Sequence, residues 1–353
     1  MIYNKCPLCS NDRAKLQQDN FTGYQVDMKF QIFLCDNCTT SYPLPRVNAD
    51  KLYDIIYKNQ ENVPGYSRYW YYFKEIKKQK NPLAFLANSG EAYWGIKEAL
   101  SKTTKSKDNL KILEVGCGLG YLTYALRLEN YDVNGIDISE EAINKAKQNF
   151  GNYFICQDLF KYVENNNEIF DVIILTEVIE HLEKPIEFLE ITLKLLKNDG
   201  KIILTTPNRS ISSLDIVWDT ESPPIHHWWF SENSMKWIAD KFKLNLDFIS
   251  FEKYYNNKPK EYNTKKIIKK VFRAPIINEK WEIYSNRIPR KKGKLEMKLK
   301  PVFYKFSFLI RAYLKLKTYI YPSTIICGER GKFMCAVFQK DQINTNTGKT
   351  VSS

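Results

Sequence analysis

Residues 110–120 read Leu-Lys-Ile-Leu-Glu-Val-Gly-Cys-Gly-Leu-Gly, and no other stretch restricts the possible fold as strongly. Residues 112–115 are a short, mostly apolar run of the kind found in a buried parallel strand. Three glycines follow at alternate positions, namely Gly116, Gly118 and Gly120. A turn without Cβ atoms lets the backbone come close to a ligand, and a helical pattern begins at Tyr121. Strand, glycine turn and helix in this order predict the first unit of a nucleotide-binding α/β sheet.

A second strand is predicted over residues 131–137, and it ends in an acid, Asp137. A carboxylate about 20 residues beyond the glycines lies where this kind of sheet holds a ribose diol. Another acid, Glu114, precedes the turn. Its charge would repel a pyrophosphate but suits a cationic amino-acid group. The pattern therefore favours S-adenosylmethionine over NAD.

Five successive motifs resemble those of class I S-adenosylmethionine-dependent methyltransferases. They are ILEVGCGLG, GIDIS, CQDLF, FDVIILTEVIEHL and LKNDGKIILTTPN. The resemblance covers roughly residues 90–252 and resumes at 326–340. It implies an α/β fold with a seven-stranded, Rossmann-like sheet, mostly parallel with the last strand antiparallel. It also implies a set of cofactor-binding residues: Glu114, Gly116, Gly118, Gly120, Asp137, Ile138, Asp158, Leu159 and Thr176. In this family the position of Asp158 contacts the adenine amino group.

Two CxxC pairs, Cys6–Cys9 and Cys35–Cys38, lie near the amino terminus. Each pair places two thiolates on one tight turn, and two such turns complete a tetrahedral zinc site. The segment holds too few apolar residues to fold unaided, so the metal would supply much of its stability. We predict a structural Zn²⁺ bound in a zinc ribbon. Free thiols or a redox pair are the alternative.

The chain begins Met-Ile-Tyr-Asn-Lys-Cys, without the apolar run of a signal peptide, and holds no apolar stretch long enough to span a bilayer. Eight cysteines without a secretory context suit a reduced compartment. We therefore expect a cytoplasmic protein. Its 353 residues, 44% of them hydrophobic, are enough for a sizeable core with appendages.

The net charge of +13 is concentrated in one segment, because residues 253–317 hold 20 Lys and Arg against 4 Glu. Basic clusters occur at 265–270 and 290–294, and residues 301–316 carry an apolar helical stripe. Such a helix can lie on an anionic membrane face, which would make the protein peripheral on the inner membrane. It can equally be a lid with a solvated basic side.

The predicted organisation has five parts. These are a zinc ribbon (1–45), a helical connector and substrate cap (46–109), the methyltransferase core (110–252 plus 326–340), a basic helical insertion (253–325) and a disordered tail (341–353). The connector includes an aromatic cluster at 66–73, which either lines a substrate pocket or packs a helix onto the sheet.

The motif Glu177-Val-Ile-Glu180-His181, with a later histidine pair, resembles ubiquinone-pathway O-methyltransferases and small-RNA 2′-O-methyltransferases. Some of these bind a divalent ion that grips a vicinal diol. Carried over, the ligands of Mg²⁺ or another divalent ion would be Glu177, Glu180, His181 and His226 or His227. Alternatively the motif is a structural helix start, and His226 or His227 is a general base. The candidate catalytic residues are Glu177, His181, His226 and His227.

We expect methyl transfer to a hydroxyl of a sugar or glycan, on a surface polysaccharide or lipid-linked saccharide. The zinc ribbon before this core resembles bacterial glycan and deoxysugar methyltransferases. Three alternatives stay open. The first is a ribosomal-RNA or other RNA methyltransferase, whose phosphates would suit the basic segment. The others are a sugar C-methyltransferase and a non-catalytic binding module of the same fold.

Overall fold

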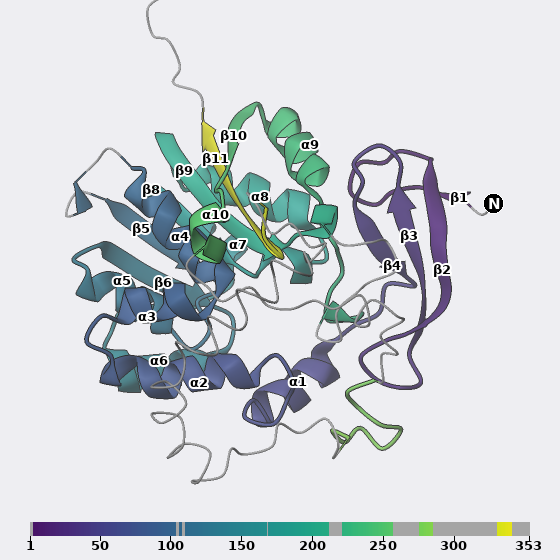
Figure 1. Ribbon diagram of the computed structural model, residues 1–353, viewed down its shortest axis with the longest axis horizontal. Helices are drawn as coiled ribbons and strands as arrows, with labels where there is room; N and C mark the ends of the chain where they lie inside the picture. Colours follow the sequence, from purple (N-terminus) through teal and green to yellow (C-terminus); the bar gives the residue numbers. More distant parts are fainter. Residues whose placement is uncertain are drawn as a thin grey trace, which may run out of the picture.

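The computed structural model describes residues 3–103, 106–107, 110–167, 169–211, 221–256, 275–284 and 330–340. A small antiparallel sheet is formed by the first four strands in the order β1-β2-β3-β4 (Figure 1). Their bounds are β1 Tyr3–Asn4, β2 Ala14–Thr22, β3 Lys29–Cys35 and β4 Ser41–Leu44. All four cysteines of the predicted ribbon lie at the ends of these strands or in the turns beside them.

A second sheet has seven strands in the order β10-β11-β9-β8-β5-β6-β7. The bounds are β5 Lys111–Val115, β6 Asp132–Asp137, β7 Phe154–Cys156, β8 Phe170–Thr176, β9 Leu196–Pro207, β10 Leu244–Phe248 and β11 Phe333–Lys340. Strands β5 to β9 pair in parallel, while β11 is antiparallel to both β9 and β10. The predicted mostly parallel sheet with an antiparallel last strand is confirmed.

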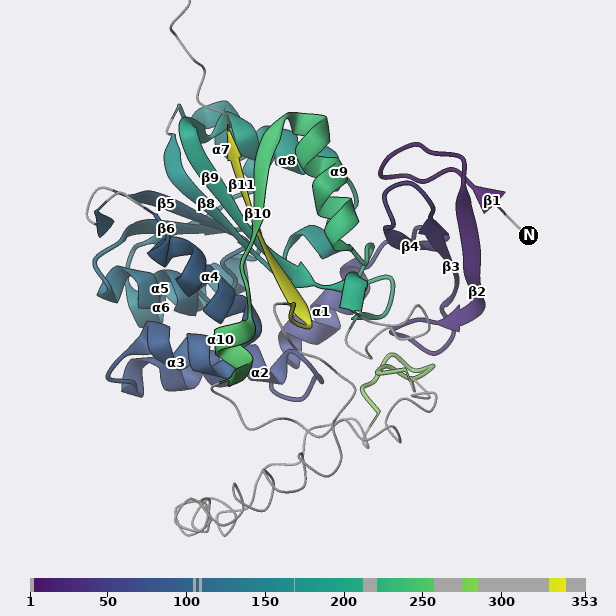
Figure 2. The same ribbon diagram turned by 45° about the horizontal axis from the view of Figure 1, so that its top comes forward.

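Helices cover both faces of this sheet (Figures 1 and 2). One face packs against α4, α5 and α6, with α2 and α3 outside them, and the other packs against α7, α8 and α9. Burial on both faces explains the continuous apolar run of β8. The bounds are α1 Asp50–Lys58, α2 Ser67–Glu75, α3 Pro82–Ser89, α4 Glu91–Ser101, α5 Tyr121–Leu128, α6 Glu140–Phe150, α7 Leu159–Asn165, α8 Pro185–Lys194, α9 Glu232–Phe242 and α10 Glu252–Asn256.

Side-chain caps begin two of these helices. Ser139 accepts a hydrogen bond from Ala142 N and begins α6, and Ser231 accepts one from Ser234 N and begins α9. Each cap satisfies a backbone N–H that has no partner within the helix. Helix α9 lies next to the small sheet (Figure 1).

Most of the predicted basic insertion, including both lysine-rich clusters and the helical stripe at 301–316, lies outside the described residues, as does the predicted tail at 341–353. Residues 275–284 are described, and Ile276 and Ile277 are buried with Tyr24 of the small sheet and Ile56 of α1. Among the helices that the structure describes, none combines the length and apolar character needed to cross a membrane.

Candidate active site

The glycine turn between β5 and α5 is built from residues with left-handed backbones. The φ angles of Gly116, Gly118 and Gly120 are 75°, 51° and 75°, in a region that side chains other than glycine rarely adopt. A Cβ on Gly116 would lie 2.5 Å from Val178 Cγ2, whereas one on Gly118 would have no described atom within 4 Å. The middle of the turn therefore faces open space, as a turn that receives a ligand must.

Asp137 ends β6 directly beside this turn. Its Oδ2 accepts a hydrogen bond from Gly118 N at 2.8 Å, and its Oδ1 accepts one from Ser139 N at 2.8 Å. Burial raises the pKa of the carboxyl, and the backbone N–H groups oppose that shift. Ile138, the next residue, is 74% exposed. Ile138 therefore offers an apolar surface on which the base of a nucleoside could pack if its ribose bound Asp137.

Glu114 is the penultimate residue of β5 and is 3% exposed. Its Oε2 accepts a hydrogen bond from the hydroxyl of Thr123 in α5 at 2.5 Å. Burial raises the pKa of this carboxyl to about 8, against the lowering effect of Thr123. The carboxyl is thus neutral over much of the physiological range unless a cation lies near it.

Three more predicted cofactor residues follow β7 and β8. Asp158 Oδ1 accepts hydrogen bonds from Phe160 N and Lys161 N, so it caps α7. Leu159 is buried. Thr176 Oγ1 at the end of β8 is buried and has no partner within the described chain. The open glycine turn, the exposed Ile138 and this orphaned hydroxyl fit a bound S-adenosylmethionine.

A second cluster lies past the end of β8, in the 3₁₀ turn Ile179–His181 and the segment before α9. Ligand atoms of Glu180, His181 and His226 all lie within 4.8 Å of one another. The two imidazole rings are tilted at 74° with centroids 4.5 Å apart. One carboxylate and two imidazoles form a donor set that suits a divalent transition ion.

The tautomer of His181 follows from its partner. His181 Nδ1 lies 2.8 Å from the carbonyl oxygen of Ile225. A carbonyl only accepts, so Nδ1 must carry the hydrogen, and the neutral ring keeps the lone pair on Nε2. Burial lowers the pKa of His181. The ring is therefore neutral and fixed in the form that can bind a metal or accept a proton.

The other two members of the cluster have atoms with no partner. Glu180 Oε2 and His226 Nδ1 are buried, and neither finds a hydrogen-bond partner among the described residues. Burial raises the pKa of Glu180 well above its usual value and lowers that of His226 well below, the latter helped by His181, His227 and Arg68. Buried polar atoms without partners are uncommon and costly. Their convergence fits an ion that supplies the missing contacts.

Glu177 and His227 are not part of this cluster. Glu177 has a φ of 54°, so the backbone is not helical there and its side chain leaves the face shared by Glu180 and His181. Its carboxylate pairs with Arg68 of α2. The His227 ring is also placed elsewhere, and its backbone N–H donates to Glu180 O at 2.9 Å. Burial and then Arg46 lower the pKa of His227 to about 4, so this ring is neutral near pH 7.

A cavity of about 220 Å³ is lined by Glu177 and by the cluster of Glu180, His181 and His226. Its lining residues are Gly65, Tyr66, Arg68, Tyr69, Glu177, Glu180, His181, Pro207, Glu221, His226, Lys332 and Phe333. The aromatic stretch 66–73 has two roles. Tyr66 and Tyr69 line the cavity, while Tyr72 packs on Tyr93 and Tyr121 of the helices that cover the sheet. Sequence reasoning missed Arg68. The signal was a lone cation within that aromatic stretch.

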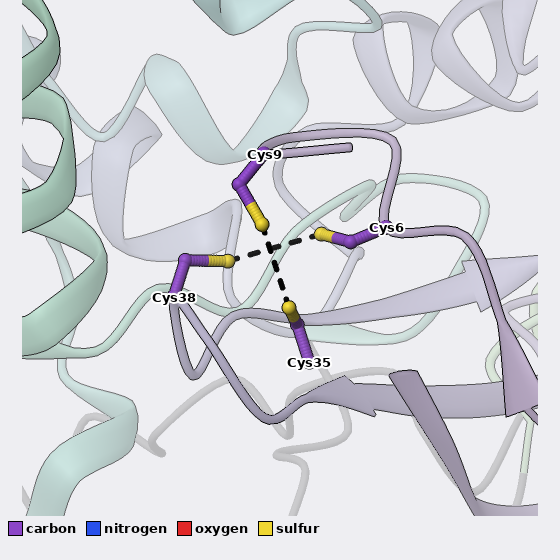
Figure 3. A group of neighbouring side chains, drawn as sticks. All are labelled: Cys6, Cys9, Cys35 and Cys38. Atoms are coloured by element: carbon purple, nitrogen blue, oxygen red, sulfur yellow. Dashed lines mark hydrogen bonds between the residues drawn. The ribbon is translucent and has the colours of Figure 1, made fainter. Parts of the chain in front are cut away.

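The four cysteines of the small sheet converge as predicted (Figure 3). The Sγ atoms of Cys6 and Cys38 are 3.8 Å apart, and those of Cys9 and Cys35 are 3.5 Å apart. A tetrahedron with Zn–S bonds of about 2.3 Å has edges of about 3.8 Å. These distances are far beyond a disulfide bond. The donor set and its spacing fit Zn²⁺.

Part of the chain is similar in sequence to known methyltransferases. A methyltransferase-domain family matches residues 89–247. A ubiquinone biosynthesis O-methyltransferase of Actinobacillus pleuropneumoniae is 31% identical over 116 residues, which is 30% of this chain and 50% of the relative. A Coxiella burnetii protein of the same name is 33% identical over 107 residues, 29% of this chain and 45% of the relative. The chain thus spans about half the length of the curated relatives it matches. A solved S-adenosylmethionine-dependent methyltransferase from Archaeoglobus fulgidus is 14% identical with a TM-score of 0.44, covering 77% of this chain and 100% of that one.

Proposed function

We propose that this chain, whose residues 89–247 form a class I S-adenosylmethionine-dependent methyltransferase domain, transfers a methyl group to a hydroxyl of a saccharide. One observation carries the proposal. Glu180, His181 and His226 converge beside a cavity, and buried atoms of the first and last have no partner among the described residues. The alternatives of C-methylation and pure binding do not explain these three groups.

On the donor side, this chain holds and orients the ligand. Asp137 is fixed by two backbone N–H groups and would accept the ribose hydroxyls, while Ile138 would cover the base. The Gly118 backbone would lie against the amino-acid part. Bound S-adenosylmethionine supplies an electrophilic methyl group, so the protein needs only to align an acceptor and take one proton.

On the acceptor side, His181 and Glu180 manage the proton and the charge. The Nε2 lone pair of neutral His181 can receive the hydroxyl proton, because Ile225 O holds the other ring nitrogen as a donor. A divalent ion held by Glu180, His181 and His226 would use that same lone pair and is therefore the alternative to proton transfer to His181. It would add a Lewis-acidic charge that lowers the pKa of the acceptor hydroxyl. A cluster of this kind suits an acceptor with two adjacent hydroxyls.

The saccharide assignment rests on the cavity. Its volume of about 220 Å³ suits a single ring. Tyr66, Tyr69 and Phe333 supply aromatic surface, and most of the remaining lining residues are charged or are histidines. Aromatic faces with convergent polar groups suit the apolar faces and hydroxyl rims of a sugar. The relatives named for ubiquinone biosynthesis support hydroxyl chemistry at this kind of site.

The test is a methyl-transfer assay on the full chain with S-adenosylmethionine and a panel of acceptors. The panel contains nucleotide sugars, lipid-linked saccharides, a catechol and ribosomal RNA. The expected product is a saccharide heavier by one methyl group, with the methyl on oxygen by NMR. His181→Asn should lower turnover about 100-fold or more while keeping donor affinity, and Glu187→Gln on the exposed side of α8 should change neither. Methylated RNA, a methylated catechol alone or a C-methyl product would overturn the proposal.

We also propose that the basic segment 253–317 brings the protein to acceptors on an anionic membrane face. The support is its charge, 20 Lys and Arg against 4 Glu, since each basic residue near such a surface adds about 1 kcal/mol of attraction. Sedimentation with vesicles tests this. Vesicles containing phosphatidylglycerol should bind the protein at low salt and release it at high salt, and neutral vesicles should not bind it. Equal binding to both would contradict this proposal.

A further inference from the structure

We infer that the zinc ribbon positions the acceptor site, because it holds the segment 225–231 that carries His226. We call this segment the strap. The inference rests on the proposed function for the role of His226 as a metal ligand. The contacts that hold the strap are observed independently of that function. The strap lies between the ribbon and the turn at Ile179–His181, and hydrogen bonds tie it to both.

The ribbon holds the strap through the residues directly after Cys38. Ser41 and Trp229 form an antiparallel bridge, in which Ser41 N donates to Trp229 O at 3.0 Å and Trp229 N donates to Ser41 O at 2.9 Å. The hydroxyls of Thr39 and Ser231 share a hydrogen bond. Main-chain and side-chain contacts thus fix one side of the strap to the second cysteine turn.

A buried hydroxyl pair links the metal ligand itself to the start of α9. Thr40 Oγ1 donates to Ser234 Oγ at 2.7 Å, and Ser234 Oγ donates to Cys38 O at 3.1 Å. The Cys38 thiol also lies 3.3 Å from Thr40 Oγ1. Thr40 and Ser234 are both 0% exposed. Water cannot replace these bonds, so the cysteine turn and the end of the strap must keep their relative position.

The active-site side of the strap is bound just as closely. His227 N donates to Glu180 O at 2.9 Å, and Trp228 Nε1 donates to Leu182 O at 2.7 Å. Ile225 O accepts from His181 Nδ1 at 2.8 Å. Three residues of the strap are therefore bonded to the turn that supplies Glu180 and His181 or to the residue that follows it.

His226 depends on this clamp for its position. Its Nδ1 has no hydrogen-bond partner among the described residues, so the orientation of the ring depends on its contact with the His181 ring and on the backbone of the strap. Loss of the zinc-held turn would leave the strap bound on one side only, so its amides would exchange faster and the His226 ring would be held less firmly beside Glu180 and His181. Thr40 and Ser41 are thus positioning residues for a site on the other side of the strap.

The experiment uses the full chain and two readouts, hydrogen exchange of the strap amides by mass spectrometry and Mn²⁺ binding by electron paramagnetic resonance. Thr40→Val removes the hydroxyl between Cys38 and Ser234, and Thr40→Ser restores it. Thr192→Val is the matched control, because Thr192 is also 0% exposed and its hydroxyl bonds to Phe188 O within α8. Zinc content and S-adenosylmethionine affinity show that each variant is folded.

We expect Thr40→Val to keep its zinc, to exchange the amides of 226–230 faster and to bind Mn²⁺ about tenfold more weakly. Thr40→Ser and Thr192→Val should behave as the unchanged protein, and chelation of zinc should produce the larger form of the same effect. Unchanged exchange in the strap after zinc removal would overturn the inference. If the unchanged protein binds no Mn²⁺, the proposed ion site fails, and the exchange result alone decides the positioning.

Discussion

The backbone N–H of Gly118 donates a hydrogen bond to Asp137 Oδ2 at 2.8 Å, which ties the middle of the glycine turn to the acid at the end of β6. The second oxygen of the same carboxylate accepts from Ser139 N. One side chain thus joins the turn after β5 to the turn before α6. The donor site is held in shape by the residue that would also contact the ligand.

The first prediction concerns this carboxylate. Asp137→Asn removes the charge and one of two acceptor oxygens, so we expect the dissociation constant for S-adenosylmethionine to rise at least about tenfold, as calorimetry would show. Asp132→Asn is the control, because Asp132 lies at the opposite end of β6 and its side chain is 53% exposed. Equal affinities of the two variants would mean that the ribose contact lies elsewhere.

The second prediction concerns Glu114 and pH. Its pKa of about 8 lies above the usual 4.5, so between these pH values the folded protein keeps a proton that the unfolded chain has lost. Its contribution to stability is therefore complete below pH 4.5 and is lost as pH rises toward 8, with a slope of at most about 1.4 kcal/mol per pH unit.

Glu114→Gln should remove this component. Urea unfolding of both proteins between pH 5 and 8, without S-adenosylmethionine, measures it. The advantage of the variant should grow with pH. A difference that stays constant over this range would show that Glu114 is ionised in the folded protein.

The third prediction concerns the backbone at Glu177. A φ of 54° costs a residue with a Cβ about 1 kcal/mol or more, and glycine avoids that cost. Both Glu177→Gly and Glu177→Ala lose the pair with Arg68. We therefore expect the glycine variant to be more stable than the alanine variant by about 1 kcal/mol, and both to lose turnover.

Glu190 provides the comparison, because it is exposed in the middle of α8. There the order should reverse, with glycine less stable than alanine by about 1 kcal/mol. Urea unfolding measures all four variants. The same order at both positions would contradict a left-handed backbone at Glu177.

The fourth prediction concerns the metal of the ribbon. The purified protein should contain one zinc per chain by elemental analysis, and Cys38→Ser should lose it together with several degrees of melting temperature. Cys156→Ser should keep the zinc, because Cys156 is exposed and outside the cluster. Zinc loss in both variants, or in neither, would contradict a four-cysteine site.

The parts of this molecule that sequence reasoning reached are those with short-range rules. A glycine turn and a CxxC pair each depend on residues within a few positions, so their spacing in the sequence predicts them. The central strands β5 and β8 are short, mostly apolar runs, which the sequence marks directly. The features it missed are contacts between residues far apart in the sequence, or they depend on the sign of a backbone φ angle. The pairing of Arg68 with Glu177 joins residues 109 positions apart, and no spacing rule marks it.

If a helix began at Glu177, its side chain would share one face with those of Glu180 and His181, but the left-handed backbone at Glu177 prevents this. Sequence reasoning also gave no sign that Ile276 and Ile277, inside the basic segment, would be buried with Tyr24 of the ribbon. Burial of a short apolar pair depends on which surface the chain meets. That information is absent from the pair itself.

Strand β11 lies between β9 and β10, although it follows β10 by more than eighty positions, and Phe248 faces Ala336 across the pair. During synthesis, β9 and β10 therefore emerge with a gap between them that only the later strand can fill. The entropic cost of closing a loop grows only with the logarithm of its length. The chain between β10 and β11 can therefore be shortened, lengthened or exchanged at little energetic cost. The connection between β10 and β11 is thus a position at which related proteins can carry different insertions without changing the residues around the candidate active site.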